Sequence, residues 1–391
     1  MKILFLHKWL IVGGIERVLV NYFKLLYDID NLDIDNLDID LLIAFEKEKS
    51  PFIEEIPNNI NISYIFNKDK TLQIEHSEKY RKNNLLHRVF YKLRKLQDKS
   101  FCKRTLSNVI LNGNYDVIIN FSNHFDPYLE FKNISVPIIR WQHLALDIGN
   151  VNLKKEKNIL KNYTKVVSIC NEMTEQIKRY TGLEDEKLFT LFNPIDFSTI
   201  IEKSLRSIPD IKKPYFIQVA RLDKIKRHKD LINIYAKLVD LGIEENLYII
   251  GDGEEYSNLM NQIKKLNLED RCFLLGEIKN PYPYMKNAKL FLHVSEREGL
   301  PTVLLESLIL NVPVIAMNCE TGVKEILNYG KCGKLIEFFN QESFIEECFK
   351  LSQCNSSLEK YKIEIRKHLS LFSEENIKYR FLTLLKNLLR K

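Results

Sequence analysis

The sequence of 391 residues lacks several patterns that would assign it directly to a common class of protein. Its seven cysteines form no Cys-x-x-Cys pair, which excludes a zinc ribbon and a thioredoxin-type motif. No uninterrupted apolar run reaches about 18 residues, so no membrane-spanning helix is predicted. Neither a Gly-x4-Gly-Lys-Ser/Thr loop nor a complete Gly-x-Gly-x-x-Gly fingerprint is present, which argues against P-loop chemistry and against a nicotinamide dehydrogenase.

The sequence also lacks a strong charge bias and a recognisable export signal. Lys and Arg total 58 against 52 acidic residues, and a net charge of +6 is too small for a dedicated nucleic-acid-binding protein. His7 and Lys8 interrupt the apolar start of the chain, and no small-residue cleavage site follows. The cysteines form no disulfide framework of the kind found in small secreted domains. We therefore expect a cytoplasmic protein.

Short apolar segments alternate with amphipathic segments through most of the chain. Many of the apolar segments are near-continuous runs of Ile, Leu, Val and Phe, which is typical of parallel strands buried on both faces. Alternating strands and helices predict an α/β fold, with helices on both sides of a parallel sheet. The predicted strands fall into two groups, 2–7, 39–45, 61–66, 117–121, 136–142, 165–170 and 187–192, then 215–221, 246–251, 272–276, 290–295, 313–317 and 333–337.

Two groups of strands predict two domains. The boundary is expected near residues 195–214, a stretch with little periodicity that is bounded and interrupted by prolines. Apolar residues at helical spacing predict a helix over 15–27, after the first strand, and another over 374–391.

Residues 28–40 form an internal repeat with three Asp-x-Asp triplets. Such a triplet can hold a divalent metal when it ends a buried strand and other ligands converge on it. Here the triplets precede the strand predicted at 39–45. This position favours a short tandem duplication in a solvated loop over a metal site.

Residues 79–104 contain ten Lys or Arg and a single acidic residue. Leu86, Val89, Leu93 and Leu96 recur at helical spacing within this run, which predicts a basic amphipathic helix. Such a helix can lie on an anionic membrane surface. It can equally pack its apolar stripe on the N-terminal domain, and the sequence leaves both possibilities open.

Residues 295–306 carry the most informative motif, Ser-Glu-Arg-Glu-Gly-Leu-Pro-Thr-Val-Leu-Leu-Glu. Glu298 follows a predicted strand, and Glu306 lies on the helix that is expected to begin near Pro301. Ligands of open α/β sheets bind at the carboxyl ends of the strands. The N-terminus of the helix adds N–H groups that attract an anion. The motif therefore predicts a ligand site at this edge of the sheet.

This motif resembles the E-x7-E signature of retaining glycosyltransferases of family four, whose GT-B fold has two Rossmann-like domains facing across a cleft. Further segments are similar in order and spacing along most of the chain: Gly13-Gly-Ile-Glu-Arg17, Asn193-Pro-Ile-Asp196, Val219–Lys226, Ile250-Gly-Asp-Gly253, Leu275-Gly276 and Asn280–Met285. The chain departs from the family at Ala220 and Asn311, where glycine is usual, and by having Gly-Leu-Pro directly after Glu298. None of these departures removes a charged functional group.

The resemblance implies the division of the chain and the roles of individual residues. It implies an acceptor-side domain over 1–200, a nucleotide-sugar-binding domain over 201–372, and a helix over 373–391 that returns to the first domain. The implied catalytic residues comprise the cations that neutralise the leaving diphosphate, a carboxylate that binds the donor sugar and a histidine near the reacting sugar: Arg221, Lys226, Glu298 and His143. The implied nucleotide-sugar contacts are backbone groups of the glycine-rich loop, a carboxylate on the ribose diol and neighbouring residues: Gly13, Gly14, Glu306, Gly299, Leu300 and Ile278.

The implied reaction is transfer of a hexose or N-acetylhexosamine, with retention, from a nucleotide diphosphate sugar to a lipid-linked, lipopolysaccharide or capsule glycan. The overall resemblance favours a UDP-sugar. No cofactor or metal is expected, because Arg221 and Lys226 would neutralise the diphosphate. The basic helix would place the enzyme on the inner face of the plasma membrane. Two alternatives remain, a nucleotide-sugar epimerase of the same fold and a non-catalytic glycosyltransferase-like partner subunit.

Overall fold

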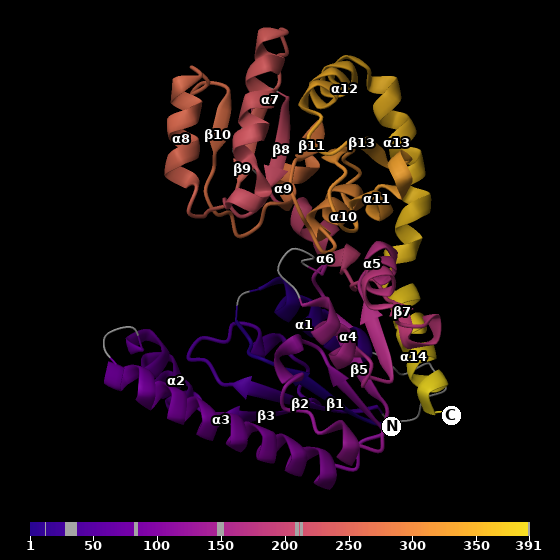
Figure 1. The fold of residues 1–391 in the computed structure, drawn as a ribbon. Helices are drawn as coiled ribbons and strands as arrows, with labels where there is room; N and C mark the ends of the chain where they lie inside the picture. Colours follow the sequence, from indigo (N-terminus) through magenta and orange to yellow (C-terminus); the bar gives the residue numbers. More distant parts are fainter. Residues whose placement is uncertain are drawn as a thin grey trace. The chain divides into compact units, whose positions relative to one another are not determined.

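A computed structural model describes residues 1–11, 13–27, 37–81, 85–146, 152–207, 211 and 214–389 (Figure 1). The chain forms two compact units. Unit 1 comprises Met1–Ile169, Thr174–Pro194 and Ile377–Lys391, and unit 2 comprises Cys170–Met173 and Ile195–Asn376. Unit 1 is therefore built from segments that lie on both sides of unit 2 in the sequence.

The core of unit 1 is a seven-stranded sheet in the order β3-β2-β1-β4-β5-β6-β7, and every neighbouring pair is parallel. The strands are short and almost wholly apolar, because both faces of the sheet are covered. Their bounds are β1 (Lys2–His7), β2 (Asp38–Phe45), β3 (Asn61–Phe66), β4 (Val117–Asn120), β5 (Ile138–Gln142), β6 (Lys165–Ser168) and β7 (Leu188–Thr190).

The helices associated with unit 1 are α1 (Gly14–Tyr27), α2 (Lys68–Tyr80), α3 (Leu85–Asn112), α4 (Leu153–Leu160), α5 (Asn171–Thr181) and α14 (Glu374–Leu389). Side-chain caps begin some of them: the side chain of Asn67 accepts a hydrogen bond from the Lys70 N–H at the start of α2, and Asn152 does the same for α4. Figure 1 shows α3 as a long helix alongside α2.

The last helix, α14, completes the core of unit 1. Phe381 is fully buried, and its ring centroid lies 5.7 Å from that of Tyr22 and 6.0 Å from that of Trp141. The Arg380 guanidinium donates a hydrogen bond of 2.7 Å to the Thr190 carbonyl at the end of β7. The return of the final helix to the N-terminal part of the chain, expected from the sequence, is confirmed.

Unit 2 has a six-stranded parallel sheet in the order β10-β9-β8-β11-β12-β13. The strands are β8 (Tyr215–Val219), β9 (Asn246–Ile250), β10 (Cys272–Leu274), β11 (Leu290–His293), β12 (Val314–Met317) and β13 (Gly333–Ile336). The helices are α6 (Phe197–Ser204), α7 (His228–Asp240), α8 (Tyr256–Lys265), α9 (Tyr282–Lys286), α10 (Thr302–Ile309), α11 (Val323–Ile326), α12 (Gln341–Gln353) and α13 (Asn355–His368).

The strand order reverses direction once in each sheet, between β1 and β4 in unit 1 and between β8 and β11 in unit 2. Ligands of doubly wound sheets bind outside the carboxyl ends of the strands at such a switch point. The loops that follow β8 and β11 are therefore the first place to look for a site in unit 2.

Each of the thirteen strands predicted from the sequence is present, and each starts and ends within three residues of its predicted bounds. The expected helices over 15–27 and at the end of the chain correspond to α1 and α14. The main segment of unit 2 begins at Ile195, at the start of the proline-containing stretch in which the boundary was expected.

Most of the Asp-x-Asp repeat, residues 28–36, lies outside the described residues. Of the last triplet, Asp40 is held within unit 1: its carboxylate accepts hydrogen bonds from the Tyr115 hydroxyl at 2.7 Å and the Asn61 amide at 2.9 Å, and Lys2 Nζ lies 3.3 Å away. These bonds give Asp40 a structural role. No group of three or more His, Cys, Asp or Glu within the described part of the chain is placed to hold a metal ion.

The basic segment forms the end of α2 and most of α3, and its apolar stripe faces solvent. The exposed fractions are 70% for Leu86, 69% for Phe90, 65% for Leu96 and 55% for Leu93. The stripe therefore does not pack on unit 1, which was one of the two possibilities left open by the sequence. Within the described residues, no helix is both long and apolar enough to cross a membrane.

Candidate active site

An ion pair joins the two loops at the switch point of unit 2. Lys226 ends a short 3₁₀ turn (Lys224–Lys226) after β8, and Glu298 lies between β11 and α10. The Lys226 ammonium donates to both carboxylate oxygens of Glu298, at 2.7 and 2.8 Å. The side chains are 23% and 10% exposed, so this pair is largely shielded from water. The structure thus brings together two residues that are 72 positions apart in the sequence.

The backbone around each partner fixes the geometry of the pair. The side chain of Asp223 caps the 3₁₀ turn by accepting from the Lys226 N–H at 3.2 Å. The Glu298 N–H donates to the Glu320 carbonyl at 2.7 Å, and the Thr321 hydroxyl donates to the carbonyls of Glu298 and Gly299. The loop that carries Glu298 is therefore attached to the loop after β12.

Gly322 is required for this attachment. Its φ is +82°, and a Cβ at this position would lie 2.8 Å from the Gly299 carbonyl oxygen. Leu300, the next predicted contact residue after Gly299, is buried. Its backbone and side chain also lie close to Gly322, so residues 299–300 are held tightly by the neighbouring loop.

His293 belongs to the same cluster and was not predicted from the sequence. It is the last residue of β11, its side chain is 2% exposed, and its Nε2 lies 3.5 Å from Glu298 Oε1. Burial lowers the pKa of His293 to about 4, so the imidazole is neutral at physiological pH. Its position at the carboxyl end of the switch-point strand was the signal that could have identified it.

Arg221 does not join the ion pair. Its side chain is 76% exposed, and its Nε and Nη2 both lie 2.8 Å from Asp223 Oδ2. The carboxylate that caps the 3₁₀ turn thus also orients the guanidinium. This arrangement holds Arg221 after β8 with most of its charge accessible to solvent.

Glu306 is partly buried on α10, and no described residue donates a hydrogen bond to its carboxylate. Burial raises the pKa of Glu306 to about 7. The carboxyl is therefore about half ionised near pH 7 in the folded protein. Ile278, also predicted to contact the nucleotide sugar, is partly buried in the segment between β10 and α9.

The glycine-rich loop after β1 is shaped by Glu16. A Cβ on Gly13 would lie 2.2 Å from Glu16 Oε2, so any larger residue would displace that carboxylate. Glu16 is itself buried, and its Oε1 lies 3.5 Å from His7 Nε2. Gly14 begins α1, and a Cβ there would meet no atom within 4 Å. Packing thus explains why position 13 requires glycine, but it does not explain the glycine at position 14.

His143 lies just after β5 in unit 1. Its Nε2 is 2.9 Å from the Phe121 carbonyl oxygen, and its ring is parallel to that of Trp141. Burial lowers the pKa of His143 to about 3, so the ring is neutral. A neutral imidazole held in this way can take part in hydrogen bonding but brings no positive charge.

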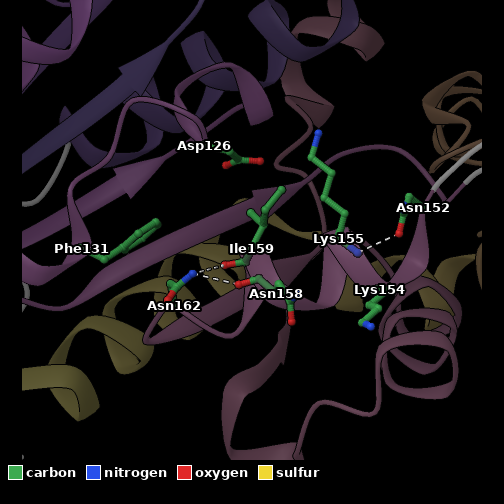
Figure 2. A pocket seen from close by; sticks show the side chains of 8 residues that line it. All are labelled: Asp126, Phe131, Asn152, Lys154, Lys155, Asn158, Ile159 and Asn162. Carbon is green, nitrogen blue, oxygen red and sulfur yellow. Dashed lines mark hydrogen bonds between the residues drawn. The ribbon is translucent and has the colours of Figure 1, made fainter. Parts of the chain in front are cut away.

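A pocket of about 370 Å³ lies along α4 in unit 1 (Figure 2). Figure 2 shows Lys155, Lys154 and Asn158 around it. The Asp126 carboxylate at its wall is already engaged, since it accepts from the Tyr163 hydroxyl at 2.6 Å and the Arg140 Nε–H at 2.9 Å. None of the predicted site residues lines this pocket.

Residues 201–368 match the family model described as Glycosyl transferases group 1. This stretch extends from α6 to the end of α13 and contains Lys226, Glu298 and Glu306. The ion pair at the switch point therefore lies within the matched stretch.

One curated relative is the N-acetylgalactosamine-N,N'-diacetylbacillosaminyl-diphospho-undecaprenol 4-alpha-N-acetylgalactosaminyltransferase of Campylobacter jejuni. It is 32% identical over 204 residues, which cover 52% of this chain and 54% of the relative. The chain spans about half the length of the curated relatives it matches.

Solved structures match almost the whole chain. The apo form of the lipopolysaccharide outer core galactosyltransferase WaaB has a TM-score of 0.72 at 19% identity, covering 99% of both chains. Anabaena HepE in complex with UDP has a TM-score of 0.72 at 17% identity, covering 99% of this chain and 100% of the other. These neighbours are GT-B glycosyltransferases, and the chain has the GT-B fold that the sequence predicted.

Proposed function

We propose that this protein is a retaining glycosyltransferase that moves a hexose or N-acetylhexosamine from a nucleotide diphosphate sugar to a growing glycan. The observation that carries the proposal is the shielded Lys226–Glu298 ion pair at the switch point of a glycosyl transferases group 1 domain. A diphosphate leaving group gains negative charge as the glycosidic bond breaks. A fixed cation beside it stabilises the transition state more than the ground state.

In this mechanism the cations act on the leaving group and the carboxylates bind the donor. Lys226 supplies a point charge, and Arg221 supplies a planar fork that Asp223 orients. The acceptor hydroxyl attacks on the face from which the diphosphate leaves, and the diphosphate oxygen takes its proton. Glu298 then binds a donor-sugar hydroxyl and Glu306 binds the ribose diol, so neither acts as a nucleophile. Because the protein supplies the cations, transfer needs no metal ion and should be unaffected by EDTA.

The proposed donor is a UDP-sugar and the proposed acceptor is a lipid-linked, lipopolysaccharide or capsule glycan. The similarity to HepE with bound UDP supports the choice of nucleotide. The names of the Campylobacter relative and of WaaB support acceptors of this class. A transferase would consume the nucleotide sugar only when an acceptor is present, whereas an epimerase would convert it without an acceptor. A non-catalytic subunit would leave the nucleotide sugar unchanged in both cases. One assay with and without acceptor therefore separates the three functions.

Nucleotide binding is tested by thermal shift with UDP, GDP, ADP and their common sugar conjugates. We expect UDP and UDP-sugars to raise the melting temperature, since a ligand at a hundred times its Kd adds about 2.7 kcal/mol. Glu306→Gln should weaken this shift because an amide cannot accept both ribose hydroxyls as a carboxylate does. No shift with any nucleotide, in folded protein, would contradict the proposal.

The same Glu306→Gln variant should be more stable than the wild type without nucleotide at pH 8. The raised pKa means that the folded state holds a proton that the unfolded chain loses above its ordinary pKa of about 4.5. Stability therefore falls as the pH rises from about 4.5 to 7, at a total cost on the order of 3 kcal/mol. At pH 4 the two proteins should melt alike, which is the internal control.

We further propose that the outward face of α3 rests on an anionic membrane surface. Its exposed apolar stripe lies between cationic side chains, and Arg88, Lys92 and Lys99 are exposed beside it. Apolar side chains enter the boundary between headgroups and acyl chains while Lys and Arg meet lipid phosphates. An anionic bilayer can contact both the apolar stripe and the cationic side chains of this face.

Vesicle sedimentation tests this face. Replacing Arg88, Lys92 and Lys99 with Gln should weaken binding to anionic vesicles about 100-fold, at about 1 kcal/mol for each charge. Arg94 is left unchanged because it donates to Gln73 at 2.8 Å within the helix pair. Leu111→Gln, at the far end of α3 and 61% exposed, is the matched control and should bind like the wild type. Equal binding by the triple variant would remove the membrane role from α3.

A further inference from the structure

Two lysines converge on one tryptophan at the carboxyl edge of the unit 1 sheet. Lys8 and Trp9 follow β1, and Lys47 follows β2. The Lys8 ammonium lies 3.5 Å from the centroid of the Trp9 ring, and the Lys47 ammonium lies 4.8 Å from the same centroid. Two like charges are therefore held within about 8 Å of each other on adjacent strand ends, at the edge where ligands of parallel sheets bind.

The surroundings of the two lysines only partly balance their charge. Lys47 forms an ion pair with Glu75 of α2, whereas no carboxylate among the described residues pairs with Lys8. Burial and the nearby Lys47 charge lower the pKa of Lys8, and the smaller effects of Glu78 and Glu16 act in the opposite direction. The site thus keeps one partly buried cation without a direct counterion. Such an arrangement is stabilised by an incoming anion.

A pocket with mostly apolar walls adjoins this cluster through Phe45, whose N–H donates a hydrogen bond of 3.0 Å to the Lys8 carbonyl. Its volume is about 120 Å³, and its walls include Phe45 and Phe66, the last residues of β2 and β3, and Ile74, the neighbour of Glu75 on α2. Helix α3 adds three cations and one carboxylate to the wall: Arg94, Lys95, Lys99 and Asp98. A volume of this size holds a short stretch of hydrocarbon, since an apolar cavity of about 150 Å³ holds benzene.

We propose that this cluster and pocket bind the lipid phosphate of an acceptor, with the phosphate on Lys8 and Lys47 and the first carbons of the lipid chain on Phe45 and Phe66. The inference rests on the proposed function and names the part of the acceptor that unit 1 would recognise. A lipid diphosphate is the ligand class that presents an anion directly attached to hydrocarbon. A neutral sugar fits less well, because the face of Trp9 on which it would stack already carries an ammonium group.

The protein carries its own probe for this site. It has two tryptophans, and Trp141 is fully buried in the core of unit 1, so a ligand at the lysine pair should change chiefly the fluorescence of Trp9. The experiment titrates the full chain with farnesyl diphosphate, farnesol and inorganic diphosphate. We expect saturable binding of farnesyl diphosphate, at least tenfold tighter than inorganic diphosphate and farnesol. A Trp9→Phe variant should lose the signal.

Variants separate the two halves of the site. Lys8→Gln should weaken farnesyl diphosphate binding by at least tenfold and Lys47→Gln by less, because Glu75 already shares the charge of Lys47. Lys132→Gln changes an exposed lysine elsewhere in unit 1 and should leave binding unchanged. Equal affinity for farnesyl and inorganic diphosphate would overturn the apolar half of the proposal. Equal affinity of Lys8→Gln and the wild type would overturn the whole of it.

These outcomes are distinguishable from failure of the proposed function. UDP-sugar binding, followed by thermal shift, should be the same in Lys8→Gln and the wild type, because Lys8 is not among the predicted nucleotide-sugar contacts. The charged contacts Lys226, Glu298 and Glu306 belong to unit 2, and Gly13 and Gly14 of unit 1 would contribute only backbone groups. Binding of farnesyl diphosphate without any nucleotide binding would retain the lipid site and overturn the transferase proposal. Nucleotide binding without farnesyl diphosphate binding would retain the transferase proposal and overturn the lipid site.

Discussion

Replacing Lys226 with alanine is expected to lower kcat/KM for glycosyl transfer by about 10²–10³-fold, with most of the loss in kcat. The ammonium is held by both oxygens of Glu298 and by the capped turn at residues 224–226, so it is fixed before the donor binds. A fixed charge needs no reorganisation when the leaving group becomes more negative. Steady-state kinetics with a UDP-sugar and an acceptor measure the loss.

The variant also leaves Glu298 without its cation in a site that is 10% exposed, and this should cost about 1–3 kcal/mol of stability. The double variant Lys226→Ala/Glu298→Gln removes the unpaired charge and should recover that stability without recovering activity. Lys229→Ala is the matched control, because Lys229 lies three residues away and pairs with Glu255 at a position that is 54% exposed. Recovery of activity in the double variant, or an equal loss in Lys229→Ala, would show that the pair only maintains the fold.

Replacing Phe381 with alanine is expected to destabilise unit 1 by about 3–5 kcal/mol, the usual cost of emptying a large core position. Phe381 is fully buried on α14 and packs against Tyr22 of α1 and Trp141 of β5. Its loss leaves a cavity between the sheet and the N-terminal helix, because both contact this ring. Urea unfolding followed by Trp141 fluorescence, in a Trp9→Phe background, reports on unit 1.

Tyr379→Ala is the matched control on the same helix. Tyr379 is 66% exposed, so its truncation should change the free energy of unfolding by less than about 0.5 kcal/mol. An equal effect of the two substitutions would mean that α14 contributes through its helical propensity and not through the buried ring.

The sheets were predictable from the sequence because strands buried on both faces are apolar along their whole length. All thirteen strands were found in this way, and their ends were overestimated where an apolar residue continues past the last pair of the ladder, as at Ile169 and Cys170 after β6. Apolar periodicity alone could not orient α3. It shows that a helix has an apolar face, but whether that face is buried depends on what packs against it.

The candidate site was predictable residue by residue but not as a geometry. Glu298 and Lys226 were both named, yet their contact depends on the adjacency of β8 and β11, which are not consecutive in the chain. His293 was overlooked because its neighbours in the sequence are apolar strand residues. The bond between Arg221 and Asp223 depends on side-chain orientation in a loop, which no periodicity reports.

The position of α14 has a consequence for the order in which the protein is made. Unit 1 takes its last helix from residues that follow the whole of Ile195–Asn376, so the ribosome must synthesise unit 2 before the final helix of unit 1 emerges. At about 5–20 residues per second this takes roughly 10–40 s. During that interval Tyr22 and Trp141 lack the ring of Phe381 that covers them in the finished protein. The nascent N-terminal unit therefore exposes apolar surface of the kind that is prone to aggregate before folding is complete.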